Sequence, residues 1–301
     1  RPIRDLKPGD WLVMAPGVWL GRSDELPNFQ YRPKPGGNAT SFKPRPVRFP
    51  RRLTPELAEF IGLFIGDGSN HRDGIRFSIG RQDEDLVQWL VERCQSLFGK
   101  RPVVSRKRDG NFEVALLSAP VKEWLRAIGV EKPSSREARV PDVVLKAPAR
   151  VACAFLRGLF TADGYVDRDG AIRLTSKDRG MLREVQELLL LFGIVSKVYE
   201  RPYAREFKYV GRDGRPRAYR SGGYHELVIA NYSRRIFAER IGFEGAKRGK
   251  LRVRKAKVDK PYATVEAVED AGEAMVYDLT VPGFQTYASG CFISHNCGEV
   301  P

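Results

Sequence analysis

The sequence predicts an α+β protein with β-rich ends and a duplicated α/β unit between them. Three observations lead to this prediction. Residues 11–14 are a short apolar run of strand length, and residues 262–281 alternate between apolar and polar side chains, as strands do. An apolar, glycine-bearing helix that ends in Asp-Gly occurs twice. Each copy is followed by the same order of strand, helix and strand, which indicates an internal duplication.

Composition favours a nucleic-acid partner. Hydrophobic residues make up 42% of the 301-residue chain, which is enough to fill the cores of two or three domains. Lys and Arg number 52 against 37 Asp and Glu, so the formal charge is +15 and the pI is about 9.8. This excess favours an anionic polymer, although a merely soluble basic protein remains the alternative.

Several classes of protein are disfavoured. No apolar run approaches the roughly 20 residues that span a bilayer, and the first residues lack a signal-peptide pattern. We therefore expect a cytoplasmic protein with no membrane partner. The four cysteines are widely spaced without a Cys-x-x-Cys pair, and there are three histidines, so neither a zinc site nor a disulfide framework is expected.

The first elements can be assigned in order. A Pro-Gly-Asp turn precedes the strand at residues 11–14. Residues 16–50 are rich in Pro, Gly and basic side chains without a sustained period, which predicts a long irregular connection and a domain boundary. Thr54 can then cap a helix that has Pro55 at its first position. A strand at 75–80, a helix at about 83–98 and strands near 103 and 112–117 complete the first copy of the repeat.

The second copy begins near residue 151 and matches the first at a constant spacing. Gly62 corresponds to Gly158 and Asp67 to Asp163. Small residues four apart on each helix allow two helices to pack closely, which would bring the terminal Asp side chains together. For one helix alone, a core helix ending in an Asp-Gly turn would be the simpler interpretation. Two matched copies instead favour a functional site formed by both Asp side chains.

Paired carboxylates at this position suit a divalent cation. Adjacent carboxylates repel each other and raise each other's pKa unless a cation lies beside them. Mg²⁺ prefers carboxylate and water oxygens, so Asp67 and Asp163 are the candidate Mg²⁺ ligands and catalytic residues. Such a pair fits metal-assisted phosphodiester hydrolysis.

The segments AEFIGLFIGDGS and AFLRGLFTADGY resemble the two signature motifs of LAGLIDADG (DOD-type) homing endonucleases, over residues 53–200. The resemblance implies a pseudo-twofold α/β endonuclease that cuts double-stranded DNA, with Asp67 and Asp163 as metal ligands. Family members also use basic residues near the site. Lys177, which the repeat aligns with Arg81, is the candidate, and a solvated lysine at a helix start is the alternative. The segment ARVPDVV resembles the family's basic-x-Ile-Pro segment between the two motifs, and its Arg139 stands near the position where a Lys is usual.

A basic segment follows the duplicated unit. Residues 200–260 contain 18 Lys and Arg against 7 Asp and Glu, interleaved with aromatic residues. This segment fits an accessory DNA-binding role, with a solvated basic loop as the alternative. The candidate DNA-binding arginines are Arg81, Arg212, Arg215, Arg217, Arg220, Arg234 and Arg235.

The stretch YDLTVPGFQTYASGCFISHNC resembles the C-terminal signature of inteins, which are protein-splicing elements with an all-β, horseshoe-shaped Hint fold. The side-chain amide of Asn296 can attack its own carbonyl carbon and break the chain, with His295 polarising that carbonyl. Cys297 would be the first residue of the host protein and would accept the upstream segment.

Two further positions bear on this chemistry. Asp278 matches the acidic position of the signature and would tune Cys297 or relay protons, with a structural hydrogen bond as the alternative. Gln285 stands where many inteins have His, so it can hydrogen-bond but not exchange protons.

Residues 3–13 resemble the intein segment that follows the N-terminal splicing motifs, and the sequence holds no such motifs. A complementary N-terminal intein piece, as in a split intein, is therefore an expected partner. CGEVP resembles a ribonucleotide reductase segment, which suggests such a host protein.

Together these expectations define a Hint splicing domain interrupted by a LAGLIDADG endonuclease. The predicted divisions are 1–50 (Hint and connection), 51–200 (endonuclease core), 201–255 (basic accessory segment), 256–296 (C-terminal Hint segment) and 297–301 (host remnant). Two alternatives stay open: a splicing protein whose endonuclease is an inactive DNA-binding relic, and an endonuclease that does not splice.

Overall fold

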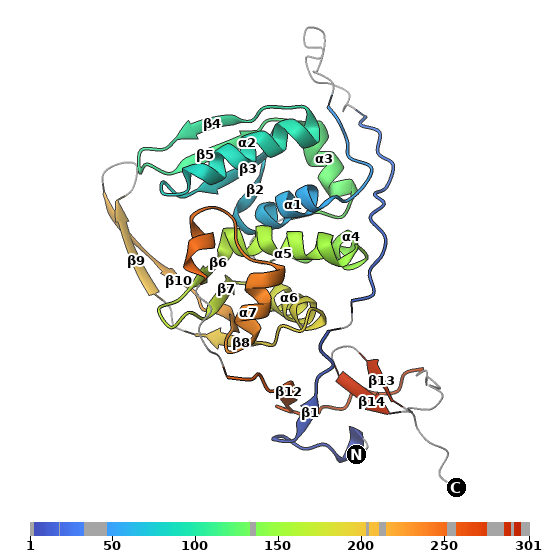
Figure 1. The fold of residues 1–301 in the computed structure, drawn as a ribbon. Helices are drawn as coiled ribbons and strands as arrows, with labels where there is room; N and C mark the ends of the chain where they lie inside the picture. The colour runs from blue at the N-terminus through green and yellow to red at the C-terminus, as the bar shows by residue number, and fades with distance from the viewer. Residues whose placement is uncertain are drawn as a thin grey trace.

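The computed structural model describes residues 3–17, 19–32, 47–132, 137–202, 205–210, 215–251, 257–275, 286–289 and 292–295. At its centre lie two adjacent helices, α1 (Pro55–Asp67) and α5 (Ala149–Asp163), shown in Figure 1. Each helix begins one half of a duplicated α/β domain, and each leads directly into a strand.

The two halves repeat one order of elements. The first continues with β2 (Gly68–His71), β3 (Gly74–Ile79), α2 (Glu84–Phe98), β4 (Val103–Arg106), β5 (Phe112–Leu116) and α3 (Ala119–Ala127), and α4 (Asp142–Leu145) precedes the second half. The second continues with β6 (Gly164–Val166), β7 (Ile172–Ser176), α6 (Arg179–Leu191), β8 (Ser196–Arg201), β9 (Arg205–Val210), β10 (Pro216–Ser221), β11 (Tyr224–Ile229), α7 (Ser233–Arg240) and the 3-10 helix η2 (Gly245–Lys250). The antiparallel sheets have the equivalent orders β2-β3-β5-β4 and β6-β7-β11-β8.

The start and the packing of α1 follow from its sequence. The Thr54 hydroxyl accepts a hydrogen bond from the Leu57 amide at 3.3 Å, and Pro55 occupies the first turn, as expected. Where α1 crosses α5, a Cβ on Gly62 would overlap the carbonyl oxygen of Phe155, and a Cβ on Gly158 would overlap that of Glu59. Glycine at these positions allows the backbones to approach directly, because any side chain would separate the helices.

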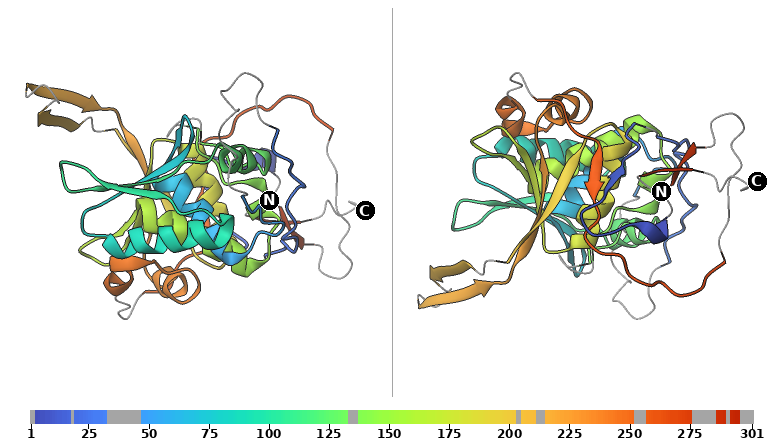
Figure 2. Two further views of the ribbon diagram at one scale, coloured as in Figure 1. Left: turned by 90° about the horizontal axis from the view of Figure 1, so that it is seen from above. Right: turned by 90° about the horizontal axis from the view of Figure 1, so that it is seen from below.

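The sheets cover the helices with one face and leave the other open (Figure 2). Residues of β3 and β5 alternate between buried apolar side chains, such as Phe77 and Val114, and more exposed polar ones, such as Arg76 and Glu113. The second sheet alternates in the same way, with Leu174 and Leu227 buried. This period of two is that of a sheet with one face in the core.

The duplicated core does not end at residue 200, where the sequence predicted its boundary. The expected boundary at residue 200 falls inside β8, and β11 pairs with both β7 and β8 in the middle of the second sheet. Leu227 and Ile229 of β11 are fully buried, and Phe237 of α7 packs edge-on against Phe160 of α5. These core contacts make residues 224–243 part of the second half rather than an accessory segment. The net positive charge of the segment obscured its short apolar runs.

The connection after β1 is also packed, where the sequence predicted a boundary. The Trp19 ring stacks on Phe192 with centroids 5.0 Å apart, and its indole N–H donates to the Ala147 carbonyl at 2.8 Å. The ring of Phe29 lies against Phe49, which in turn packs against Trp124 of α3. We call residues 15–17, 19–32 and 47–53 the strap. The strap contacts both halves of the core along one side (Figure 1).

The two ends of the chain meet in small β pairings. Strand β1 (Trp11–Val13) follows η1 (Ile3–Asp5) and pairs antiparallel with β12 (Tyr262–Thr264); Trp11 stacks on Tyr262 at 4.7 Å. Strands β13 (Thr286–Ser289) and β14 (Phe292–His295) form a second pair, joined to the first by a bridge between Met14 and Phe292. Residues 265–275, predicted as strand, lack regular structure. The expected Hint horseshoe is not shown by these pairings.

Within the part of the chain described here, no helix is long and apolar enough to cross a membrane.

Candidate active site and nucleic-acid face

The duplicated helices bring two carboxylates together. Asp67 is the last residue of α1 and Asp163 the last of α5. The helix ends approach so closely that a Cβ on Gly66 would lie 3.3 Å from Oδ2 of Asp163. Burial, and next the negative charge of Asp163, raise the pKa of Asp67 to about 7, and burial also raises the pKa of Asp163. The pair therefore forms a site where negative charge is costly without a nearby cation.

Two lysines, one from each half, face this pair. The Lys132 ammonium group donates to the Gly66 carbonyl at the end of α1. The Lys247 ammonium group donates to the carbonyls of Thr161 and Ala162 at the end of α5, at 2.6 and 2.9 Å. Both lysines favour the ionised form of both aspartates, and burial lowers the pKa of each lysine. The duplication thus supplies two aspartate carboxyl groups and two lysine ammonium groups, related by pseudo-twofold symmetry.

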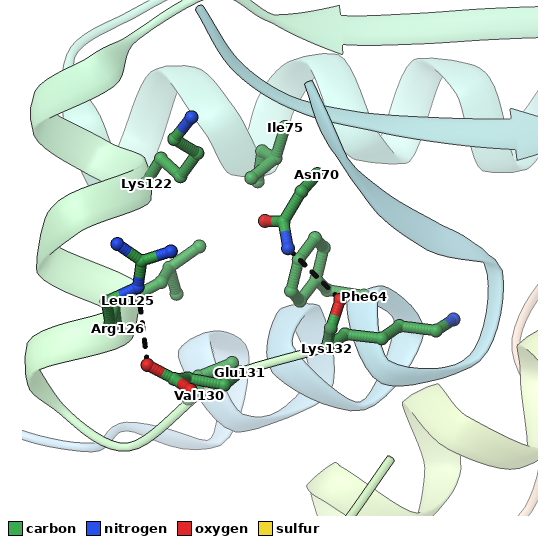
Figure 3. A pocket seen from close by; sticks show the side chains of 9 residues that line it. All are labelled: Phe64, Asn70, Ile75, Lys122, Leu125, Arg126, Val130, Glu131 and Lys132. Carbon is green, nitrogen blue, oxygen red and sulfur yellow. Dashed lines mark hydrogen bonds and ion pairs between the residues drawn. The ribbon is translucent and has the colours of Figure 1, made fainter. Parts of the chain in front are cut away.

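Lys132 is held in place through its backbone. The Asn70 side chain donates to the Lys132 carbonyl at 3.0 Å, while the ammonium group extends away from Asn70 (Figure 3). A pocket of about 70 Å³ lies beside this contact, and Arg126 pairs there with Glu131 at 3.3 Å. The pocket is lined by Phe64, Asn70, Ile75, Lys122, Leu125, Arg126, Val130, Glu131 and Lys132. Asn70 and this polar wall fix the segment that presents Lys132.

Three basic residues were expected near the acids, and their role at the site stays a prediction. Lys177 is exposed at the end of β7, and Arg81 is exposed in the longer turn between β3 and α2. Arg139 pairs with Asp178 at the start of α6 and with Glu184 at 3.6 Å. None of these three is among the charges that shift the pKa of Asp67 or Asp163. The sequence did not indicate Lys132 and Lys247. Each lysine follows the third helix of its half, and the two positions correspond only when α3 is matched with α7 in the structure.

The open face of the second sheet carries a network centred on Glu226. Its carboxylate is nearly buried, with 4% side-chain exposure, and accepts hydrogen bonds from Tyr165 at 2.8 Å, Arg173 at 2.7 Å and Arg201 at 2.6 Å. These bonds lower the pKa of Glu226 despite its burial. The Arg201 guanidinium also lies over the ring of Tyr199, 5.2 Å from its centroid. The network holds cationic and aromatic groups in fixed positions on this face.

The first sheet repeats the network in a looser form. Arg76 corresponds to Arg173 and Glu113 to Glu226 in strand register. Arg76 donates to the Ser69 hydroxyl at 3.0 Å and lies 3.8 Å from Glu113, which also pairs with Lys107 at 3.3 Å. The matching segments IRF and IRL could have indicated these arginines from sequence. Their spacing is one residue longer than that of the helices, so the helix alignment did not pair them.

The arginines predicted to bind DNA have several locations. Arg215 and Arg217 are exposed in and beside β10, whereas Arg212 and the side chain of Arg220 lie outside the described residues. Arg234 donates to the Asp169 carbonyl at 3.1 Å, and Arg235 pairs with Glu239 at 2.8 Å within α7. Both arginines belong to α7, whose Phe237 packs against Phe160 of α5.

Most of the predicted splicing residues lie outside the part of the chain that the structure describes. Asp278, Gln285, Asn296 and Cys297 lie outside the described residues, and only the backbone of His295, at the end of β14, is described.

The aspartate pair suits Mg²⁺ on chemical grounds. Two buried carboxylates with raised pKa values are relieved by a divalent cation, and they lie where the carbonyl ends of two helix dipoles meet. The described residues contain no cluster of three or more His, Cys, Asp or Glu side chains that could hold a metal. Mg²⁺ is compatible with this set because it commonly takes one or two carboxylates and completes its coordination with water and phosphate oxygens.

Part of this chain resembles a known protein family, and longer stretches resemble known proteins. The sequence model of the LAGLIDADG-like domain family matches residues 150–242. The ATP-dependent DNA helicase Hel308 of Thermococcus kodakarensis is 26% identical over 258 residues, covering 82% of this chain and 22% of the helicase. A DNA polymerase of Thermococcus litoralis is 29% identical over 276 residues, covering 83% and 15%. The replication factor C small subunit of Methanocaldococcus jannaschii is 26% identical over 216 residues, covering 71% and 11%. The chain therefore spans 11–22% of the length of these curated relatives.

This chain is also similar to solved structures of homing endonucleases. I-DmoI in complex with DNA and Ca is 18% identical, covers 63% of this chain and 90% of its own, and has a TM-score of 0.43. I-WcaI bound to its DNA recognition sequence is 13% identical, with 67% and 88% covered and a TM-score of 0.42. The family match therefore covers the second half of the duplicated core: residues 150–242 are a LAGLIDADG-like domain.

Proposed function

We propose that the duplicated core is a Mg²⁺-dependent, site-specific endonuclease that cuts double-stranded DNA. The observation that carries this proposal is the juxtaposition of Asp67 and Asp163 with Lys132 and Lys247, at the junction of two sheets with polar open faces. Carboxylates that hold a metal and cationic side chains that face a phosphate are groups that favour phosphodiester hydrolysis.

The roles of the residues follow from their positions. Asp67 and Asp163 would hold Mg²⁺, which when bound activates water and stabilises charge on the leaving oxygen. Lys132 and Lys247, anchored on the helix-end carbonyls, would stabilise the negative charge that develops on the phosphate. Asn70 would act as a positioning residue, because it bonds the backbone rather than the ammonium group of Lys132.

The open sheet faces would bind the duplex. Arg76 and Arg173 lie at equivalent positions on the two sheets, so they can contact the two sides of one site. The Glu226 network would hold Arg173 and Arg201 in defined orientations and reduce the entropy lost on binding. Arginines in fixed positions suit both phosphate and base-edge contacts.

The nuclease proposal is tested with a duplex selected from a randomised library by the purified chain. Wild-type protein should cut this duplex when Mg²⁺ is added. Asp67→Asn and Asp163→Asn should abolish cutting but retain binding, while Asp5→Asn, which changes an exposed carboxylate far from the site, should leave both unchanged. Full cleavage by either site variant would refute the metal-ligand assignment. A wild-type protein that binds without cutting would support the inactive relic.

We also propose that the chain ends belong to a protein-splicing domain. The supporting observation is that residues 9–14 pair with residues 261–265 and with Phe292, so the two ends meet outside the inserted core. The similarity to known proteins also supports an inserted element. A helicase, a polymerase and a replication factor share this segment, which occupies a minor part of each. A segment common to such different proteins is expected of an inserted element.

The splicing step would take place at the C-terminal signature. The Asn296 side-chain nitrogen would attack its own carbonyl carbon and form a succinimide, with release of the following segment at Cys297, while His295 polarises the carbonyl. Asp278 would assist at Cys297, and Gln285 would contribute a hydrogen bond. Trp11 and Val13 are 67% and 56% exposed on a two-stranded ribbon, which is marginal without further β structure. A complementary N-terminal intein piece would cover them.

The splicing proposal is tested by mixing the chain with an N-terminal intein piece that bears a nucleophilic Cys and a marker peptide. Mass spectrometry should detect the marker joined to CGEVP, a segment that also suggests a ribonucleotide reductase host. Asn296→Ala should block release of CGEVP and leave DNA cleavage unchanged. Continued release by Asn296→Ala would exclude succinimide formation at this residue.

A further inference from the structure

The two halves of the core differ most at one strand connection. In the first half, residues 107–111 join β4 to β5 by a short turn. At the equivalent position of the second half, residues 202–223 join β8 to β11 and contain the β9–β10 hairpin. We call this hairpin the arm. Because the sheets otherwise repeat the same strand order, the arm breaks the pseudo-twofold symmetry of the molecule.

The arm extends the outer part of the second sheet. Strands β2 and β6 begin at the ends of α1 and α5, next to the aspartate pair, whereas β4 and β8 are the outermost strands of their sheets. The arm therefore starts at the edge of the sheet that is farthest from the aspartate pair. The views in Figure 1 and Figure 2 show it projecting beyond the core, on the same side as the turn between β4 and β5.

The arm has the charge of a phosphate-binding element. Residues 202–223 contain six Lys and Arg against two Asp and Glu, whereas residues 107–111 contain two against one. Lys208, Arg215 and Arg217 are exposed, and Val210 is 70% exposed. An isolated two-stranded hairpin is marginally stable in water, so a binding partner would stabilise it. The basic side chains select a polyanion as that partner.

We propose that the arm grips the phosphate backbone of the duplex beyond the half-site that contacts the second sheet, and on that side only. This inference rests on the proposed DNA-binding function and adds a direction to it. A pseudo-symmetric core contacts equal lengths of DNA on either side of the cut. With the arm, the bound length is greater on one side, so the two flanks of the target contribute unequally to affinity. Phosphate contacts of this kind are independent of sequence and sensitive to salt.

The test combines DNA truncation with substitution of the arm. The full chain first selects a duplex from a randomised library with long constant flanks. Affinity is then measured for the full duplex and for versions shortened on one flank or the other. The arm variant is Lys208→Gln, Arg215→Gln, Arg217→Gln. The matched control is Lys7→Gln, Arg22→Gln, Arg51→Gln, which removes equal charge from exposed positions of the N-terminal segment and the strap.

The wild-type chain should lose about tenfold in affinity when one flank is shortened and little when the other is shortened. The arm variant should bind the full duplex about tenfold more weakly and lose nothing more when the same flank is removed. Its slope of log K against log salt should be smaller by about 3, since each phosphate contact contributes roughly 0.9. The control variant should keep the wild-type response to shortening.

Equal losses from both flanks, or an arm variant that keeps the one-sided response, would overturn the inference. A chain in which the turn of residues 107–111 replaces residues 202–223 should behave as the arm variant does, which guards against local misfolding. If the wild-type chain selects no duplex, the proposed DNA-binding function itself fails. That result appears before any arm variant is used, so the two failures are distinguishable.

Discussion

Asp67 links the stability of the core to pH. Its pKa is raised from 3.8 to about 7, so the folded state binds the proton more tightly than the unfolded chain does. The resulting stability is present below about pH 4 and is lost as pH rises through about 7, because folding must then bury a charged carboxylate. A shift of about three units corresponds to roughly 4 kcal/mol at most.

Asp67→Asn should therefore stabilise the metal-free protein at pH 8 by roughly 2–4 kcal/mol and have little effect at pH 4. Urea denaturation at both pH values measures the difference, with Asp5→Asn as the exposed control. Because Mg²⁺ binds the ionised carboxylate, addition of Mg²⁺ should stabilise the wild-type protein more at pH 8 than at pH 6. A variant that is less stable than wild type at pH 8 would contradict the burial of charge at this residue.

Lys132 and Lys247 should contribute to cleavage separately from DNA binding. Each ammonium group faces both aspartates. Lys132→Met and Lys247→Met should each lower the single-turnover cleavage rate about 10²–10³-fold, as removal of one charge-stabilising group does in other enzymes. Affinity should change by less than about threefold, since one of many phosphate contacts is lost. Rates measured at saturating protein separate the two effects, and a loss of affinity with an unchanged rate would assign the lysines to binding.

At the scale of elements, α1 and α5 are joined by a buried ion pair. Arg157 of α5 donates to Glu59 of α1 at 2.8 Å and lies 3.5 Å from Glu244. Glu59 is 5% exposed, and burial raises its pKa while Arg157 opposes this effect. The pair lies beside the crossing of Gly62 and Gly158, so it fixes the helices whose ends present the aspartates.

Arg157→Met should destabilise the protein by about 3–5 kcal/mol at pH 7, because it leaves the Glu59 carboxylate buried without its partner. Adding Glu59→Gln to that variant should recover much of the loss, since the buried charge is then removed. Urea denaturation of the two single variants and the double variant measures the coupling. A double variant no more stable than Arg157→Met would show that Glu59 is not the charge that Arg157 compensates.

At the scale of the whole molecule, the strap connects the chain ends to the core. Trp19 contacts the second half through Phe192 and the segment between α4 and α5 through Ala147. Phe29 and Phe49 contact the first half. The strap thus crosses both halves and leads from β1 to α1, so the proposed splicing and nuclease parts are joined by packed structure along its described residues.

Trp19→Ala should cost about 2–3 kcal/mol, because it removes a stacked ring and one hydrogen bond from a partly buried site. The loss should appear in the unfolding of the core, measured by urea denaturation followed by circular dichroism. Trp11→Ala is the matched control, since Trp11 is 67% exposed and stacks on β12 instead. An unchanged unfolding midpoint in Trp19→Ala would show that the strap does not stabilise the core.

The sequence by itself determined the features that depend on local signals. Thr54 and Pro55 indicated where α1 begins, and the repeat of Gly62 and Asp67 at Gly158 and Asp163 indicated two equivalent helices. Helix starts and small residues at helix crossings leave such signals because only a few residue types satisfy their backbone geometry. The juxtaposition of the two carboxylates follows from this duplication, and their role as metal ligands stays a prediction.

Only the tertiary structure decided which distant residues join them. Lys132 and Lys247 reach the aspartates because the segments that follow α3 and α7 pass the ends of the paired helices. Glu226 gathers Tyr165, Arg173 and Arg201 because β11 inserts between β7 and β8. These contacts bring together residues far apart in the chain, and a lysine or glutamate that makes them has the same local sequence as one exposed to solvent. Long-range packing, which sets burial and electrostatic environment, therefore assigned these side chains to the site.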